Sequence, residues 1–150
     1  MRLRIPPVLQ FFICGTIAVL GSYLLPGLNY DRALLILPAS LISIAGILLL
    51  TFSVAAFVKA RTTVNPLRPE QASQLVTTGL YRISRNPMYL ALAMILIGGA
   101  LMLGNLGALI GPIVFVCLIS VLQIKPEERI LQTQFGDTYS VYCRQTRRWI

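Results

Sequence analysis

A chain of 150 residues has the length of a single domain; 56% of its residues are hydrophobic and only 12% are charged. This composition excludes an ordinary soluble domain, and the charges fall almost entirely outside four long apolar stretches. The net charge of +8 does not indicate a nucleic-acid partner, because the basic residues flank these stretches, where membrane orientation and anionic headgroups explain them. We therefore predict an all-α integral membrane protein in which residues 1–150 form one domain.

The first two apolar stretches predict membrane-spanning helices at about 8–25 and 33–58. Pro26 and Gly27 break the first of them. No small-x-small cleavage pattern follows it, which favours a retained helix over a signal peptide. The second stretch is long for one crossing, so we expect it to tilt or to project from the bilayer.

The next two apolar stretches predict spans at about 88–103 and 107–124. The three residues 104–106 join them, and so short a connection forces an antiparallel helical hairpin. Gly107 and Gly111 form a small-x-x-x-small pair, which lets helix backbones approach closely. We thus predict about four transmembrane helices.

The distribution of lysine and arginine predicts which side each polar segment occupies. Two basic residues precede the first span, five lie in 59–87 and five in 125–150, whereas 26–32 holds one and 104–106 none. Because basic residues concentrate on the cytoplasmic side, we expect both termini to be cytoplasmic in a prokaryotic inner (plasma) membrane. The two most polar segments then share one side of the membrane and can pack together.

Cysteine and histidine usage argues against a metal centre. Cys14, Cys117 and Cys143 are scattered without pair spacing, and the chain has no histidine. We therefore predict neither a disulfide framework nor a bound metal.

The polar segments before the third span and after the fourth carry the candidate functional side chains. Both contain arginines, which bind carboxylates through two parallel hydrogen bonds, and tyrosines, whose rings contact cations. Glu127 and Glu128 suit a ligand ammonium group, although they also fit as first-turn acids of a helix that starts at Pro126 and ends at Gly136. S-adenosylmethionine has an ammonium, a carboxylate and a sulfonium, and phospholipid headgroups share part of this set.

Two spaced blocks stand out in these segments. The first is LVTTGLYRISRNPMYL at 75–90. The second is the Glu127-Glu128 pair followed by L-x-x-x-F-G-x-x-Y-x-x-Y and Arg147-Arg148-Trp149. Together they resemble the membrane-embedded superfamily of isoprenylcysteine carboxyl methyltransferases and phospholipid methyltransferases. The resemblance covers about residues 59–150, and two blocks in the same order and spacing are more specific than either alone.

The resemblance implies a helical fold without a Rossmann domain and S-adenosylmethionine as cofactor at the cytoplasmic side of the last spans. It assigns Glu128 to the cofactor ammonium. It implies a catalytic group of Arg148, Arg144 and Glu128. It also implies a cofactor pocket made of Gly79, Tyr81, Arg85, Asn86, Pro87, Tyr89, Glu127, Glu128 and Tyr139.

Two positions depart from the pattern of that superfamily. Asn86 stands where the family usually carries a histidine, so this position can form hydrogen bonds but cannot titrate near neutrality. Gln145 stands where the family often carries an arginine that orients a substrate carboxylate, which leaves Arg144 and Arg148 as the nearby candidates. Glu128 or a tyrosine remains as a possible general base.

These features together predict an S-adenosylmethionine-dependent methyltransferase acting on a lipophilic substrate that enters from the bilayer. The acceptor is either an isoprenylcysteine-like carboxylate or a phospholipid amine. One alternative is a non-catalytic membrane scaffold or carrier, which the departures at Asn86 and Gln145 favour. A second is a sterol-reductase-like nicotinamide enzyme, but a phosphorylated cofactor would need basic residues where Glu127 and Glu128 stand.

Overall fold

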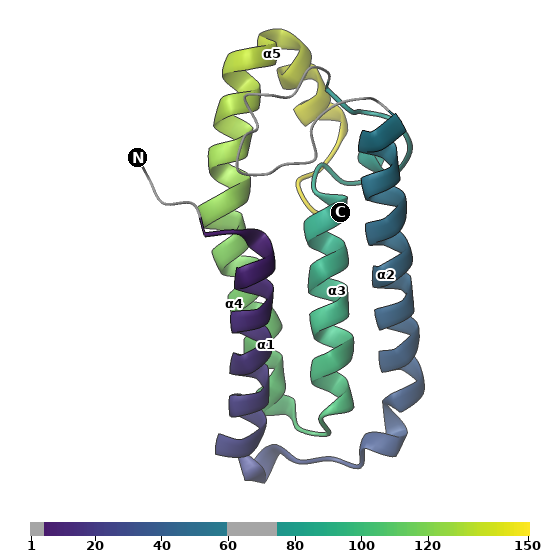
Figure 1. Ribbon diagram of the computed structural model, residues 1–150, viewed down its shortest axis with the longest axis vertical. Helices are drawn as coiled ribbons and strands as arrows, with labels where there is room; N and C mark the ends of the chain where they lie inside the picture. The colour runs from purple at the N-terminus through teal and green to yellow at the C-terminus, as the bar shows by residue number, and fades with distance from the viewer. Residues whose placement is uncertain (1–4, 60–74) are drawn as a thin grey trace.

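Lipid offers the backbone no hydrogen-bond partner, so a chain that crosses a membrane must satisfy its own N–H and C=O groups, which favours helices. The computed structural model describes residues 5–59 and 75–150, and all four predicted stretches are helical in it. They form α1 (Pro7–Leu24), α2 (Ile36–Lys59), α3 (Pro87–Met102) and α4 (Ile110–Ile119), which lie side by side along one axis (Figure 1). The prediction of an all-α membrane fold is confirmed.

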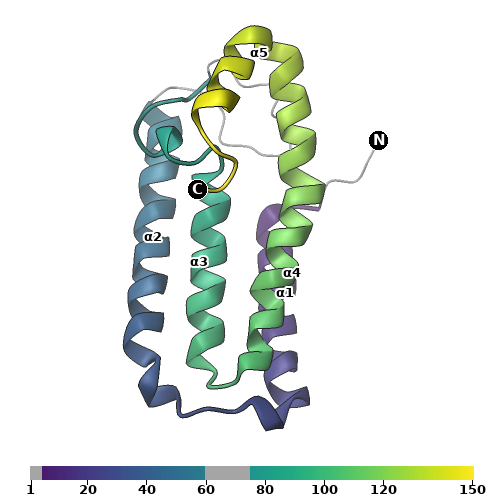
Figure 2. The same ribbon diagram turned by 180° about the vertical axis from the view of Figure 1, so that it is seen from behind.

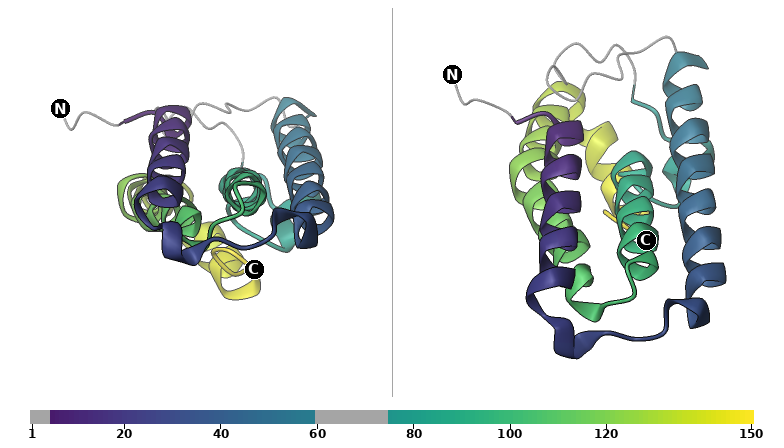
Figure 3. Two further views of the ribbon diagram at one scale, coloured as in Figure 1. Left: turned by 90° about the horizontal axis from the view of Figure 1, so that it is seen from below. Right: turned by 60° about the horizontal axis from the view of Figure 1, so that its bottom comes forward.

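Three described helical segments are long and apolar enough to cross a membrane, namely α1, α2 and the continuous stretch Leu106–Gln145. The 24 residues of α2 span about 36 Å, more than a hydrocarbon core of about 30 Å, as expected from its length in the sequence. The apolar helix α3 is shorter, with 16 residues, and lies in the middle of the bundle between α2 and α4 (Figure 3). α3 and α4 run antiparallel, so the predicted hairpin is confirmed (Figure 1).

Local hydrogen bonding explains why α2 starts later than predicted. The Asp31 carboxylate accepts a hydrogen bond from the Ala33 N–H at 2.9 Å and caps a short 3₁₀ turn, η2 (Arg32–Leu34). The α-helix therefore begins only at Ile36. α3 begins as expected at Pro87, whose fixed φ suits the first position of a helix.

The polar segments and the short connections lie at opposite ends of the bundle. The start of α1, the end of α2, the start of α3 and the polar C-terminal segment gather at one end, and the two short connections lie at the other (Figures 1 and 2). At this second end the Asn105 side chain joins the connections, since its Nδ2 donates to Asn29 Oδ1 at 2.5 Å and to Leu25 O at 2.8 Å. The two polar segments therefore lie at the same end of the fold.

This arrangement makes the sidedness testable with reporter fusions. We expect a reporter fused after Ile150 to read cytoplasmic and one fused at Asn29 to read external, because twelve of the thirteen basic residues flank one side. A fusion at Asn105 serves as control, since Asn29 and Asn105 are hydrogen-bonded and must agree. A cytoplasmic signal at Asn29 would contradict the four-span topology.

Close helix contact depends on glycine, as the pair Gly107 and Gly111 predicted. A Cβ atom on Gly111 would lie 2.6 Å from Ala18 Cβ and 2.9 Å from Ala18 N, and one on Gly107 would lie 2.6 Å from Gly21 O. None of these three separations leaves room for a side chain, so α1 packs directly against the backbone at the start of the fourth span.

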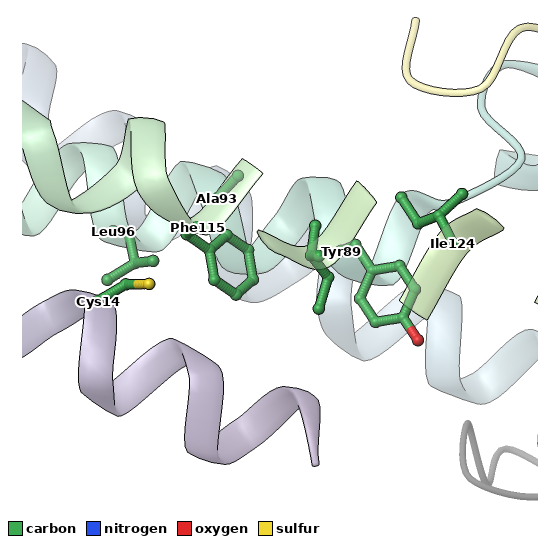
Figure 4. Packing of buried hydrophobic residues seen from close by; sticks show 7 residues of the cluster. Cys14, Tyr89, Ala93, Leu96, Phe115 and Ile124 are labelled. Atoms are coloured by element: carbon green, nitrogen blue, oxygen red, sulfur yellow. The ribbon is translucent and has the colours of Figure 1, made fainter. Parts of the chain in front are cut away.

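The buried apolar cluster lies nearer the polar end, where α1, α3 and α4 meet. Figure 4 shows its members, including Cys14 from α1, Tyr89 and Leu96 from α3, and Phe115 from α4. Trp149, near the C-terminus, packs against the same cluster. The C-terminal segment is thereby attached to the membrane-spanning core.

α4 continues without a break into the polar C-terminal segment. A single π-helical turn, η6 (Ser120–Ile124), joins it to α5 (Lys125–Gln145). Pro126 has no N–H to donate and its ring crowds the preceding turn, so an ordinary α-helical ladder is interrupted here. The π turn accommodates this, because the Lys125 N–H donates to Ser120 O, five residues back. Glu127 and Glu128 therefore lie in the first turn of α5 with Pro126 at its start, as predicted, although the chain is helical without a break from α4 through the π turn into α5.

Gly136 divides α5 into two arms. Its φ of 50° and ψ of −122° are not helical, and the positive φ favours glycine at this position. The second arm turns back toward the bundle (Figures 1 and 2). The predicted end of the first helix at Gly136 is thus confirmed, and a second helix follows it.

Candidate functional site

The second arm of α5 brings the C-terminal residues against the turn that precedes α3. The Arg85 N–H donates to Arg147 O at 3.0 Å, and Asn86 Nδ2 donates to Arg148 O at 2.9 Å. Ser84 and Arg147 form an isolated parallel bridge. The two sequence blocks thus meet in space, as expected from their shared side of the membrane.

Glu128 is bound by two arginines at this junction. Arg148 donates through Nε to Oε1 at 3.0 Å and through Nη2 to Oε2 at 2.7 Å, the two-bond geometry that a guanidinium forms with a carboxylate. Arg85 Nη2 donates to Oε1 at 2.9 Å. Both oxygens of Glu128 are therefore engaged by guanidinium groups.

The Arg85 side chain is held from three directions. Besides its contact with Glu128, Nη1 donates to Thr146 O at 2.6 Å and to Cys143 O at 3.2 Å. The side chain is only 13% exposed. Arg85 thus connects the turn before α3 to the end of α5.

The ion pairs keep these groups charged. Burial alone would raise the pKa of Glu128, but the hydrogen bonds from Arg148 and Arg85 outweigh it and hold that pKa below its ordinary value. Burial alone would lower the pKa of Arg85, but the hydrogen bond to Glu128 and the electrostatic interactions with Glu128 and neighbouring groups together outweigh it and raise the pKa. Two positive charges and one negative charge make this cluster net positive by one.

The neighbouring carboxylate has a different partner. Tyr89 on α3 donates its hydroxyl to Glu127 Oε1 at 2.6 Å. Consecutive residues on a helix point about 100° apart, so Glu127 and Glu128 serve different faces of α5. The acidic pair is therefore divided between a tyrosine and two arginines.

Buried tyrosines support the junction. Tyr142 donates its hydroxyl to Tyr81 O at 2.6 Å, and the Tyr81 ring packs edge-on against Phe57 with centroids 5.2 Å apart. Burial raises the pKa of the Tyr81, Tyr139 and Tyr142 phenols well above the ordinary value. These hydroxyls therefore stay protonated at neutral pH, and that of Tyr142 donates a hydrogen bond.

A pocket of about 570 Å³ opens beside Glu128. Its wall combines the first arm of α5 with residues from the turn before α3 and from the C-terminal segment. The lining residues are Arg85, Lys125, Glu128, Arg129, Gln132, Thr133, Tyr139, Cys143 and Arg148.

The structure brings most of the sequence-predicted site residues to this end. Arg85, Glu128, Tyr139 and Arg148 line the pocket, and Tyr89 pairs with Glu127 on the other face of α5. Their roles toward a cofactor stay predictions.

The remaining candidates occupy supporting or outlying positions. The Asn86 side chain is hydrogen-bonded to the C-terminal segment at Arg148 O, and Pro87 is the buried first residue of α3. Gly79 starts a short 3₁₀ turn, η4 (Gly79–Arg82), with a φ of 61°, and a Cβ there would meet nothing within 4 Å. Arg144 is exposed and does not line the pocket.

Sequence reasoning missed four residues of the pocket wall. Lys125, Arg129, Gln132 and Thr133 follow one another at intervals of four, seven and eight residues from the first, which places them on one helical face with Glu128. This spacing was visible in the sequence. These residues could be grouped on one face only if the helix was known to continue through Pro126.

Comparison with known proteins gives one family and one relative. The family model for phospholipid methyltransferases matches residues 34–138, from the end of η2, just before α2, into the second arm of α5. An uncharacterized protein of Haemophilus influenzae is 44% identical over 63 residues, which are 42% of this chain and 100% of that protein. No solved structure matches the chain significantly.

Proposed function

This chain belongs to the phospholipid methyltransferase family, and we propose that it transfers a methyl group from S-adenosylmethionine to a lipophilic substrate entering from the bilayer. The family and the apolar helices make it a membrane methyltransferase of lipid-like substrates. The observation that carries the finer proposal is the junction where Arg85, Glu128 and Arg148 meet beside the Tyr89–Glu127 pair.

The donors and acceptors at the junction fit the charged parts of S-adenosylmethionine. Arg85 Nε is buried and has no hydrogen-bond partner among the described residues, so it offers a positioned donor for a carboxylate. Either Glu127 or Glu128 would receive the ammonium group, and the tyrosine rings suit a sulfonium. When bound, S-adenosylmethionine would supply an electrophilic methyl group attached to its sulfonium.

The protein's own residues provide alignment rather than strong base catalysis. The phenols of Tyr81 and Tyr139 stay protonated, and the lowered pKa of Glu128 makes it a weak base. Methyl transfer gains most from holding two reactants aligned in a site that excludes water. The arrangement therefore favours an acceptor atom that arrives unprotonated, which a carboxylate does at neutral pH and an amine does only after losing a proton.

Calorimetry on the detergent-purified chain tests the proposal. We expect saturable binding of S-adenosylmethionine, and transfer of its labelled methyl group into a total membrane lipid extract. Binding of a nicotinamide dinucleotide instead would support the reductase alternative. Failure of both ligands to bind, in a sample whose Trp149 fluorescence reports a folded chain, would support the scaffold alternative.

Arg148 provides a residue-level test of the same proposal. Lysine keeps the charge but cannot form the two parallel bonds to Glu128, so Arg148→Lys is expected to reduce methyl transfer more than tenfold. Arg147→Lys is the matched control, because the Arg147 side chain is exposed and should tolerate lysine. Equal activity of both variants and the parent would reduce Arg148 to a membrane anchor.

A further inference from the structure

Two buried glutamines lie within apolar helical segments, outside the pocket beside Glu128. Gln10 is near the start of α1 and Gln123 is in the π turn η6, and the two residues are only 2% and 1% exposed. Gln10 Nε2 donates to Ile5 O at 2.9 Å, and Gln123 Nε2 donates to the same oxygen at 2.6 Å. One carbonyl oxygen therefore joins the start of the first span to the end of the last one.

Stability alone does not explain these two side chains. The Oε1 atoms of Gln10 and Gln123 are buried, and neither has a hydrogen-bond partner within residues 5–59 and 75–150. A buried acceptor without a partner costs free energy, whereas an apolar side chain of the same length would fill the space without that cost. The two amides therefore indicate a requirement other than the stability of the fold.

The hydrogen bond from Gln123 is made at the turn that sets the rotation of α5. The Lys125 N–H closes this π turn by donating to Ser120 O, five residues back. Closing it with the usual four-residue bond would change the register by one residue, which is about 100° of rotation on a helix. Glu127 and Glu128 follow directly in the first turn of α5, so their separate partners depend on the present rotation.

Gln10 acts on the same turn through the shared acceptor. Ile5 precedes α1, and the bond from Gln10 Nε2 holds its carbonyl oxygen in place. Gln123 then meets an acceptor whose position is already fixed. Any effect of Gln10 on α5 should therefore pass through Gln123 and disappear when Gln123 is replaced.

We propose that Gln123 is a positioning residue for the methyl transfer, and that Gln10 assists it by holding the Ile5 carbonyl. The bond to Ile5 O keeps the π turn, and hence the first arm of α5, in the rotation that presents its carboxylates to the site. The inference rests on the proposed function, because it concerns the alignment of the reactants in that reaction. A misplacement of about 1 Å can slow such a reaction by about a hundredfold.

The test replaces each glutamine by methionine, which has a similar length and lacks the amide donor and the unpaired oxygen. We expect Gln123→Met to lower kcat/KM for S-adenosylmethionine at least tenfold without lowering the stability of the chain in detergent. Gln10→Met should have a smaller effect, and the double variant should be no slower than Gln123→Met. Ser120→Ala is the matched control in the same turn and should change kcat/KM less than twofold, because its hydroxyl donates to Val116 O within its own helix.

A spectroscopic measurement reports the rotation of α5 directly. Arg148 Nε donates to Glu128 Oε1 at 3.0 Å, so the nitrogen-15 resonance of this N–H group is sensitive to the position of Glu128. We expect the resonance to shift in Gln123→Met and to stay unchanged in Ser120→Ala. A glutamine that served only the overall stability would leave it unchanged in a folded sample.

The inference requires both changes in Gln123→Met, the lower kcat/KM and the shifted Arg148 resonance. Either change without the other would overturn it, as would a loss of activity that only follows a loss of stability. An active parent with an unaffected Gln123→Met variant overturns this inference and leaves the proposed function intact. A parent that neither binds S-adenosylmethionine nor transfers its methyl group overturns both, so the two failures are distinguishable.

Discussion

Glu128→Gln is expected to lower the free energy of unfolding by about 2–4 kcal/mol. The substitution keeps the size of the side chain but removes the charge that holds two guanidinium groups together. Arg85, 13% exposed, would then be left with a buried charge and no carboxylate partner. The expected loss is at the lower end for a buried ion pair because Arg148 is 40% exposed and water screens part of the repulsion. Unfolding in detergent can be followed through Trp149, the single tryptophan of the chain.

Glu127→Gln is the matched control, since it removes an adjacent carboxylate that pairs with Tyr89 and leaves the arginine cluster intact. We expect a smaller loss of stability from it. Equal losses from the two variants would contradict a special role of Glu128 in joining Arg85 to Arg148. Affinity for S-adenosylmethionine, measured on both folded variants, tests which carboxylate receives the ammonium.

The same pair of variants predicts a pH dependence with a definite sign. The pKa of Glu128 is lowered in the folded state, so its contribution to stability is complete above the unfolded pKa of about 4.3. The contribution is lost as the pH falls through the lower folded value. The parent should therefore lose stability below about pH 4, and Glu128→Gln should show a smaller dependence in that range.

Gly111→Ala is expected to destabilise the bundle by about 2–3 kcal/mol, because a methyl group there would press against backbone atoms of α1. The separations of 2.6 Å to Ala18 Cβ and 2.9 Å to Ala18 N involve groups that cannot rotate away. Relief requires α1 and α4 to separate, which would also weaken the packing around Cys14 and Phe115. The measurement is again unfolding in detergent.

Gly99→Ala provides the control on the exposed face of α3. A Cβ at Gly99 would meet nothing within 4 Å, so the substitution should be neutral or stabilise the helix by up to about 1 kcal/mol. Similar destabilisation by Gly111→Ala and Gly99→Ala would show that the close contact between α1 and α4 at Gly111 does not cause the loss of stability.

Several features of this protein followed from the sequence alone. The number and approximate bounds of the apolar helices depend on hydrophobicity summed over about 20 residues, which is a property of each segment by itself. The hairpin between α3 and α4 followed from a three-residue connection, and the close contact of α1 with the fourth span followed from Gly107 and Gly111. The meeting of the two polar blocks followed from the distribution of basic residues along the chain.

The pairing of individual side chains depended on tertiary structure. Glu127 and Glu128 are equivalent by sequence, but they point to different faces of α5 and meet Tyr89 and two arginines respectively. Gln10 and Gln123, polar residues inside apolar stretches, both donate to Ile5 O, at 2.9 and 2.6 Å, and so tie α1 to the π turn.

The path of the chain after the last span decided which tail arginine reaches the site. The π turn before Pro126 sets the rotation of the first arm of α5, and the positive φ of Gly136 sets the direction of the second. Together they bring Arg148 onto Glu128 and leave Arg144 exposed. A small change in either bend would rotate a different side chain inward, so residue types and spacing alone cannot specify this pairing.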